Sequence, residues 1–292
     1  MARWQLATQT TVEVLAPQLD SAAQLAKAAE IEEIFRTAFI PTDRASEYFR
    51  WLDELRFLKQ CGRVIGPRNV GKSRTSIHYR QEDRKRVSYV RAWSESSSKR
   101  LFTQILKDIN HAAANGKRED LRPRLAGSLE LFGIELLIVD NADNLQREAL
   151  LDLKQLFDES GVPIVLVGGK ELDSKLHCFD LLTCFPTLFE FEKLDEKDLK
   201  KALEIIELDI LALLPEASDL TEGTMFETIA ISTEARVGIL IKILTKAVLH
   251  SLKKGFGKVD VEILEKITSQ YGKKYVLSKS PNDSQDSSDF AS

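Results

Sequence analysis

The sequence predicts an α/β fold, in which a parallel sheet carries helices on both faces and a smaller all-helical domain follows it. Three observations lead to this prediction. Short apolar runs alternate with helical segments between residues 62 and 191, a glycine-rich loop follows the first run, and no strand signal occurs after Leu194. Parallel strands need crossover connections, usually helices, and their burial on both faces makes them continuously apolar.

The segment before the first strand is expected to form two helices. Residues 21–35 are rich in Ala with spaced Leu and Ile, and Ile40-Pro41 ends the first helix. Between residues 44 and 60, apolar side chains recur at helical spacing, so a second, amphipathic helix leads into the glycine-rich loop. Residues 1–20 show no clear period.

Five apolar runs are predicted to form the sheet. They are residues 64–65, 87–92, 135–140, 162–167 and 188–191, with helices expected over residues 99–114 and 145–159. Continuous runs such as LLIVD and VPIVLV are typical of strands buried on both faces.

After Leu194, only helices are expected. Asp195 is placed to cap a helix that Pro215 closes, and Thr224 with Glu227 three residues later matches a capping box. Two further helices are predicted over residues 236–253 and 259–271, and the polar residues from 278 onward are expected to be disordered. The predicted division is a helical extension (1–43), an α/β nucleotide-binding domain (44–194), a helical lid (195–277) and a tail (278–292).

Length and composition narrow the classes of protein. The 292 residues suggest about two domains, at roughly 150 residues each. No apolar run approaches the roughly 20 residues of a membrane-spanning helix, and the first residues lead into no signal peptide, so we expect a cytoplasmic protein without a membrane span. The odd number and wide spacing of Cys61, Cys178 and Cys184 argue against a disulfide framework or a zinc knuckle.

The net charge of −4 hides an uneven distribution of charge. Residues 56–124 contain 18 Lys and Arg but 6 Asp and Glu, an excess of 12 positive charges, which leaves −16 for the rest of the chain. Such a segment is either a solvated charged face or a surface that meets a polyanion.

A phosphate-binding loop lies inside this basic segment. Residues 66–73 satisfy G-x-x-x-x-G-K-[ST] between an apolar strand and a helix. The glycines let successive backbone N–H groups point at a phosphate, Lys72 is expected to neutralise phosphate oxygens of ATP, and the Ser73 hydroxyl is expected to ligate Mg²⁺. The predicted nucleotide-binding residues are Gly66, Pro67, Arg68, Asn69, Val70, Gly71, Lys72, Ser73 and Arg74.

Asp140, which ends the apolar run LLIVD, is the second residue predicted to bind Mg²⁺, and it is expected to hold the metal through water. One strand candidate separates the loop from Asp140, and the P-loop proteins with this insertion that hydrolyse nucleotides carry a Glu next, which polarises the attacking water. Asn141 stands there. An amide orients a water but does not accept its proton, so weak or absent hydrolysis is expected. Asp143, the nearest alternative carboxylate, is expected to point elsewhere.

These motifs resemble those of the AAA+ ATPases, and several segments look like the TniB/TnsC family of transposition regulators, relatives of the Mu phage B protein. The segments lie within residues 40–275 and read FRWLD (49–53), CGRVIG (61–66), LLIVDNAD (136–143), VLVG (165–168) and FEKL (191–194). The resemblance implies an AAA+ fold with a helical lid. In that family, ATP-bound subunits assemble as rings or filaments around duplex DNA, mark the target, and recruit the transposase and a TniQ-like target selector.

The chain departs from the family pattern at four catalytic positions. They are Asn141 for the acid after the metal Asp, Gly169 for the sensor of the γ-phosphate, Cys184 and Pro186 for the trans-acting arginine region, and Ile239 for the lid arginine, with Arg236 close by. Together these losses imply a subunit that binds ATP and hydrolyses it poorly.

The resemblance also implies a DNA contact. Family members track one DNA strand with residues in the loop after the second strand and at the end of the next helix; these positions map onto Lys99 and Lys117, with Arg100 and Arg118 beside them. Contacts to phosphates without base readout predict sequence-tolerant, salt-sensitive binding. Trp93, directly after a strand, is a candidate for a surface role.

The predicted function is therefore an ATP-dependent, DNA-binding regulator of transposition that forms a homo-oligomer, alone or mixed with a paralogue, and recruits transposase and target selector. Two alternatives remain open. One is a hydrolysis-competent AAA+ ATPase, in which a distal carboxylate or a neighbouring subunit supports turnover. The other is a nucleotide-switched signalling or immunity P-loop protein that does not bind DNA.

Overall fold

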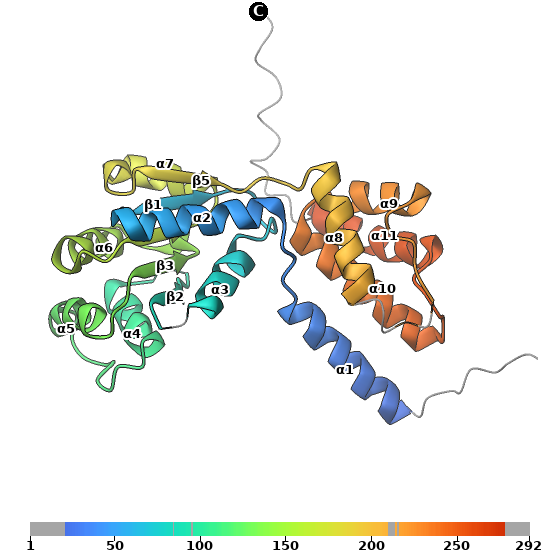
Figure 1. The fold of residues 1–292 in the computed structure, drawn as a ribbon, viewed down its shortest axis with the longest axis horizontal. Coiled ribbons are helices and arrows are strands. Elements are labelled where there is room, and N and C mark those ends of the chain that lie inside the picture. Colours follow the sequence, from blue (N-terminus) through green and yellow to red (C-terminus); the bar gives the residue numbers. More distant parts are fainter. Residues whose placement is uncertain (1–20, 84, 95, 210–213, 215, 278–292) are drawn as a thin grey trace, which may run out of the picture.

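The computed structural model describes residues 21–83, 85–94, 96–209, 214 and 216–277 (Figure 1). The aperiodic residues 1–20 and the tail expected to be disordered lie outside the described residues. A sheet with helices on both faces occupies one half of the molecule, and a group of helices occupies the other (Figure 1).

The sheet has five strands, all paired in parallel, in the order β2-β3-β4-β1-β5. The strands are β1 (Gly62–Ile65), β2 (Val87–Arg91), β3 (Leu136–Asp140), β4 (Ile164–Val167) and β5 (Thr187–Glu190). The predicted α/β class is confirmed, and β3 and β4 are buried along their whole length. Because the strands are parallel, the carboxyl ends of β1 and β3 lie at the same edge of the sheet, with β4 between them. Ligands bind at this edge in open α/β sheets.

Two apolar clusters cover the two faces of the sheet. One contains side chains of α2 (Asp43–Leu58) and α3 (Lys72–Glu82). The other contains side chains of α4 (Ser98–Asp108), α5 (Arg118–Leu131), α6 (Arg147–Ser160) and α7 (Lys170–Cys178). Helices α5 and α7 were not expected from the sequence: Pro123 lies inside α5, and α7 has only nine residues. Short 3₁₀ turns follow β3 (η1, Ala142–Asn144) and α7 (η2, Leu182–Cys184).

The remaining helices share a third apolar cluster. They are α8 (Glu196–Asp209), α9 (Gly223–Thr233), α10 (Val237–Lys254), α11 (Val261–Leu277) and the N-terminal α1 (Ser21–Thr37). Ile31 and Phe35 of α1 are buried in this cluster, so α1 packs with the lid helices rather than on the sheet. In Figure 1, α1 lies beside α10.

The helix ends confirm one predicted cap and correct another. The Asp195 carboxylate accepts a hydrogen bond from the Asp198 backbone N–H at 2.6 Å, as expected for a cap of α8. The capping box at Thr224 and Glu227 is wrong, because α9 begins one residue before Thr224 and its N-cap, Glu222, makes no side-chain cap hydrogen bond. Thr224 is already a helical residue, and a capping residue must stay outside the helix.

Candidate functional site

The glycine-rich loop connects β1 to α3 at the carboxyl edge of the sheet. Gly66 has φ +151°, and a Cβ at this position would lie 2.2 Å from the Phe191 carbonyl oxygen, so only glycine fits. Gly71, with φ +107°, is the N-cap of α3 and turns the chain into the helix. The following backbone N–H groups lie at the positive end of α3, which is a favourable place for an anion.

Lys72 is held inside this loop. Its Nζ donates to the carbonyl oxygens of Gly66 at 2.6 Å and Pro67 at 2.7 Å. Burial lowers the pKa of Lys72, and the negative charges of Asp140, Asp143 and Glu171 oppose this effect. The ammonium group is therefore held across the loop by two backbone carbonyl oxygens.

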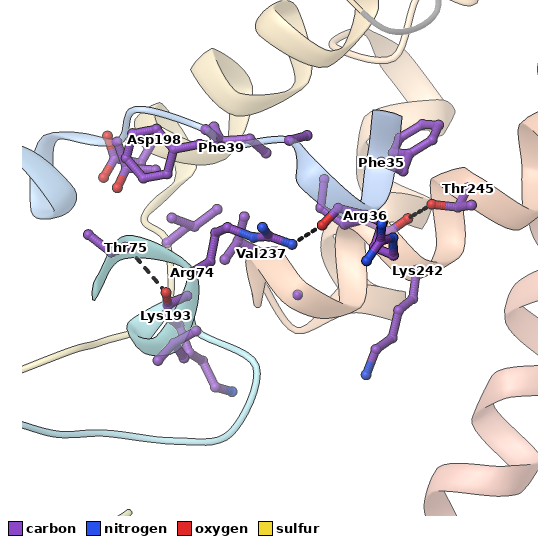
Figure 2. Close-up of a pocket in the computed structure, with 18 of the residues that line it drawn as sticks. Phe35, Arg36, Phe39, Arg74, Thr75, Lys193, Asp198, Val237, Lys242 and Thr245 are labelled. Atoms are coloured by element: carbon purple, nitrogen blue, oxygen red, sulfur yellow. Dashed lines mark hydrogen bonds between the residues drawn. The ribbon is translucent and has the colours of Figure 1, made fainter. Parts of the chain in front are cut away.

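A cavity of about 580 Å³ adjoins the loop on the side of the lid. Figure 2 shows residues that line it, which come from α1 (Phe35 and Arg36), the following linker (Phe39), α3 (Arg74 and Thr75) and α10 (Val237). The Arg74 guanidinium donates to the Arg36 carbonyl oxygen and ties α3 to the end of α1. A largely apolar cavity of this size suits a nucleobase and its sugar.

No pattern in the sequence predicts this cavity. Its walls come from residues 32–44, 70–75, 191–198 and 237–249, which meet only after the lid packs against the α/β domain. Each segment taken alone shows ordinary apolar and charged residues without a ligand-binding pattern.

The lid contacts the tip of the phosphate loop directly. The Gly238 backbone N–H donates to the Asn69 carbonyl oxygen at 2.8 Å, and Lys242 Nζ donates to Asn69 Oδ1 at 3.2 Å. A Cβ at Gly238 would lie only 3.0 Å from the Asn69 carbonyl oxygen, so glycine permits this close approach. The conformation of the loop and the position of α10 therefore depend on each other.

Asp140 ends β3 with only 1% of its surface exposed. Its Oδ1 accepts the Asn141 backbone N–H at 2.9 Å, and its Oδ2 accepts the Tyr89 hydroxyl at 2.6 Å and Arg91 Nε at 3.2 Å. A buried carboxylate at the end of β3, together with the Ser73 hydroxyl at the start of α3, supplies oxygen atoms of the kind that Mg²⁺ prefers.

The residues around Asn141 depart from the expected arrangement. Asn141 has left-handed backbone angles of φ 55° and ψ 39°, which Asn tolerates better than most residues. Asp143 does not point away from the site: its Oδ1 would lie 2.7 Å from a Cβ at Gly168, and its charge acts on Lys72. Glu171 Oε2 would likewise lie 2.2 Å from a Cβ at Gly169. The two glycines after β4 thus leave room for two carboxylates.

The positions expected for the trans-acting arginine and the lid arginine are occupied by uncharged residues, which cannot replace an arginine. Ile239 is buried in the apolar cluster of the lid, and Cys184 is half-buried beside the core. Arg236, the nearest arginine, precedes α10 and donates to Glu234 at 2.8 Å. Its Nε is buried and has no hydrogen-bond partner among the described residues.

The four candidate DNA-contacting residues fall into two pairs, one on α4 and one at the start of α5. Lys99 and Arg100 lie in the first turn of α4, whereas Lys117 and Arg118 lie beyond the loop that follows α4, at the start of α5. Lys99, Arg100 and Lys117 are exposed and form no ion pair with any residue that the structure describes. Their charges remain available to a polyanion.

Arg118 differs from the other three. Its guanidinium donates to both Asp152 oxygens, at 2.9 and 2.8 Å, and the Asp152 side chain is 3% exposed. The hydrogen bonds that Arg118 donates to Asp152 raise the pKa of Arg118. The charge of Arg118 is therefore already balanced within the protein.

Arg118→Ala is expected to destabilise the fold, because it leaves the Asp152 carboxylate buried without its partner. A loss of about 1 to 2 kcal/mol is expected, less than for a fully buried pair since Arg118 is half-exposed. Urea unfolding of this variant and of Lys117→Ala provides the test. Equal stability of the two variants would show that the Arg118–Asp152 pair contributes nothing.

Much of the basic segment is balanced in the same way. Carboxylates pair with Arg56, Arg63, Arg80, Arg86, Arg91 and Arg122. The excess of 12 positive charges along the sequence is therefore not an equal excess on the surface.

Trp93 lies beside the first pair of candidate DNA contacts. Its indole is 54% exposed, and the Arg100 guanidinium carbon lies 5.9 Å from the ring centroid. A tight turn fixes its backbone, because Ser96 Oγ accepts the Trp93 N–H and donates to its carbonyl oxygen, both at 2.8 Å. An exposed aromatic ring on a rigid turn next to two cations suits contact with a nucleic acid.

Comparison with known proteins places these features in a family context. Residues 55–176 match the family described as "AAA domain". The chain is 27% identical over 158 residues to the Mu-like prophage FluMu DNA transposition protein B of Haemophilus influenzae, an alignment covering 51% of this chain and 52% of that protein. The chain thus spans about half the length of this curated relative.

Solved structures support the fold. The Thermotoga maritima RuvB Holliday junction branch migration motor has a TM-score of 0.53 at 15% identity, over 80% of this chain and 70% of that chain. A variant of the same protein gives a TM-score of 0.50 at 16% identity, with the same coverage. The predicted AAA+ fold and the resemblance to a Mu-like protein B are confirmed. No described helix is both long and apolar enough to cross a membrane.

Proposed function

We propose that this chain, whose residues 55–176 match the family described as "AAA domain", is an ATP-binding regulator of DNA transposition that assembles on duplex target DNA in the cytoplasm. The preformed phosphate loop is the observation that supports nucleotide binding. Lys72 bonds to the loop at Gly66, and the lid bonds to it at Asn69. The transposition part rests on the likeness to the Mu-like prophage protein B.

ATP would bind across the boundary between the α/β domain and the lid. Its phosphates would lie in the loop against the N–H groups at the start of α3, and its base and sugar would lie in the adjoining cavity. Mg²⁺, held by Ser73 and Asp140, would neutralise phosphate charge. Because α10 contacts both the cavity and Asn69, a bound nucleotide would fix the lid relative to the sheet. ATP would then act as an assembly ligand.

Slow hydrolysis follows from the residues at the γ-phosphate end. Asn141 stands where a catalytic acid is expected, and an amide cannot accept a proton from water. The hydrolysis-competent alternative has one observation in its favour: the carboxylates of Asp143 and Glu171 lie beside the two glycines that follow β4. The rate of phosphate release distinguishes the two.

Duplex DNA would contact the first turn of α4 and the start of α5. Lys99, Arg100 and Lys117 would contact backbone phosphates, while Arg118 would support the fold. In a ring or filament, of this chain alone or mixed with a paralogue, each subunit would add one set of weak contacts along the DNA. The same assembly would present a surface to a transposase and a TniQ-like target selector.

Lys99→Glu combined with Lys117→Glu is expected to weaken DNA binding at low salt by about tenfold or more. Two lost phosphate contacts should also lower the slope of log affinity against log salt by about two. Fluorescence anisotropy with labelled duplexes of unrelated sequence provides the measurement. Lys253→Glu, which makes the same charge change on an exposed lid residue, is the control. An unchanged affinity in the double variant would refute the DNA-contact map.

Electron microscopy with linear duplex DNA tests the proposed function as a whole. The protein is imaged with ATP, ADP and no nucleotide, and phosphate release is followed in the same samples. ATP-dependent rings or filaments without phosphate release support the proposal, and assemblies with steady release support the hydrolysing alternative. A change in assembly that depends on the nucleotide, but not on DNA or on the salt concentration, would support the signalling alternative.

A further inference from the structure

The end of β2 places an arginine against the carboxylate expected to hold Mg²⁺. Arg91 and Asp140 are directly opposite each other in the parallel pairing of β2 with β3. Arg91 Nε donates to Asp140 Oδ2 at 3.2 Å, and Arg91 Nη2 donates to the Tyr89 hydroxyl at 3.4 Å. Tyr89 in turn donates to the same Asp140 oxygen at 2.6 Å.

Resting on the proposed function, we propose that Arg91 is a built-in counter-cation for Asp140, and that Mg²⁺ enters the site with ATP only by displacing it. Without the metal, Arg91 places a positive charge beside the buried carboxylate. With the metal, the guanidinium and Mg²⁺ compete for the same negative charge. Arg91 therefore helps to determine the Mg²⁺ concentration at which the nucleotide binds.

The hydrogen bonds of Asp140 make this competition direct. Both oxygens are engaged, Oδ1 by the Asn141 N–H and Oδ2 by Tyr89 and Arg91. The Asn141 and Tyr89 donors are neutral and can remain beside a carboxylate that holds Mg²⁺ through water. A guanidinium in contact with the same oxygen would repel the metal, so Arg91 is the donor that has to leave.

Exposure decides which partner moves. The Asp140 side chain is 2% exposed and fixed at the end of a fully buried strand, whereas Arg91 is 45% exposed. Arg91 can therefore move into water at little desolvation cost, while Asp140 cannot follow it. Arg74, whose pKa Arg91 helps to lower, lies on the neighbouring helix and would disfavour a move of Arg91 toward the cavity.

The test measures how nucleotide affinity depends on Mg²⁺. A fluorescent ATP analogue is titrated in EDTA and at increasing Mg²⁺ concentrations against the wild type and Arg91→Ala. The Mg²⁺ concentration for half-maximal binding is expected to fall about tenfold in Arg91→Ala, the size expected when one charge-assisted hydrogen bond is lost. In EDTA, Arg91→Ala is expected to bind the analogue about tenfold more weakly than the wild type, because Asp140 then repels the phosphates.

Two variants serve as controls. Arg91→Lys keeps the positive charge and is expected to bring both values back toward those of the wild type. Arg86→Ala removes an exposed arginine just before the opposite end of the same strand and should leave both unchanged. An Arg91→Ala midpoint equal to or higher than that of the wild type would overturn the inference. Failure of the wild type to bind the analogue at any Mg²⁺ concentration would instead overturn the proposed function.

A loss of folding in Arg91→Ala is also informative. Thermal unfolding in EDTA is expected to occur at a lower temperature in Arg91→Ala than in the wild type, because Asp140 is left buried without its counter-cation. Adding Mg²⁺ with the analogue should raise the Tm of Arg91→Ala more than that of the wild type. An equal increase in the two proteins would count against a displaced cation.

Discussion

Replacing Lys72 with Ala is expected to reduce ATP affinity by about 100-fold or more, because at least two charge-assisted hydrogen bonds to phosphate are lost. The Lys72 ammonium is already held over the loop by the Gly66 and Pro67 carbonyl oxygens, so it needs little reorganisation to meet the phosphates. ATP-dependent assembly on DNA should be lost with it. Isothermal titration gives the affinity, and electron microscopy gives the assembly.

Lys170→Ala is the matched control for this experiment. Lys170 is an exposed lysine at the start of α7, on the same domain but outside the phosphate loop. Its removal makes the same change in net charge and should leave affinity and assembly intact. If Lys72→Ala still assembled on DNA in response to ATP, the loop could not be the site through which ATP acts.

Replacing Asn141 with Glu is expected to raise the rate of phosphate release by about 100-fold, the lower end of what a positioned general base contributes. The variant supplies a proton acceptor directly after the metal carboxylate Asp140. The left-handed backbone at this position costs a Glu about 1 kcal/mol more than Asn, so a small loss of stability should accompany the gain. A phosphate-release assay with saturating ATP and DNA measures the rate.

Two further variants identify the source of any hydrolysis. Asn141→Gln has the length of Glu without its basicity and should remain slow. Asp143→Asn removes the carboxylate that lies against Gly168. If the wild type already hydrolysed ATP at the rate of Asn141→Glu, and Asp143→Asn abolished that activity, Asp143 would be the base and the assembly-ligand model would be wrong.

The phosphate loop and the strands around it could be predicted because their signals are contiguous in the sequence. The spacing of Gly66, Gly71 and Lys72 reports a local backbone shape, and the structure shows the close contact with Phe191 that requires the first glycine. Asp140 could be predicted as easily, because it is the one polar residue at the end of an apolar run that is buried along its whole length. A sequence pattern predicts a site when one short segment contains all the residues that the site needs.

Features built from distant segments could not be predicted in this way. Counting charges along residues 56–124 suggested a strongly basic surface, yet the partners of Arg63 and Arg118 are Asp173 and Asp152, in the acidic remainder of the chain. The Arg91–Asp140 pair forms because β2 and β3 are neighbours in the sheet, and the order of the strands could not be predicted from the sequence. The cavity requires α1 and α10 to meet, which depends on packing between the two ends of the described chain.

The position of α1 has a consequence for how the chain folds. Its buried residues Ile31 and Phe35 complete an apolar cluster whose other members lie in the last helices, almost the whole chain length away. During synthesis, α1 leaves the ribosome first and has no packing partner until α10 has been made. Such long-range closure is entropically costly and slow, so docking of α1 is expected to be a late step in folding. The cavity is incomplete until that step, and newly made chains should acquire the ability to bind nucleotide last.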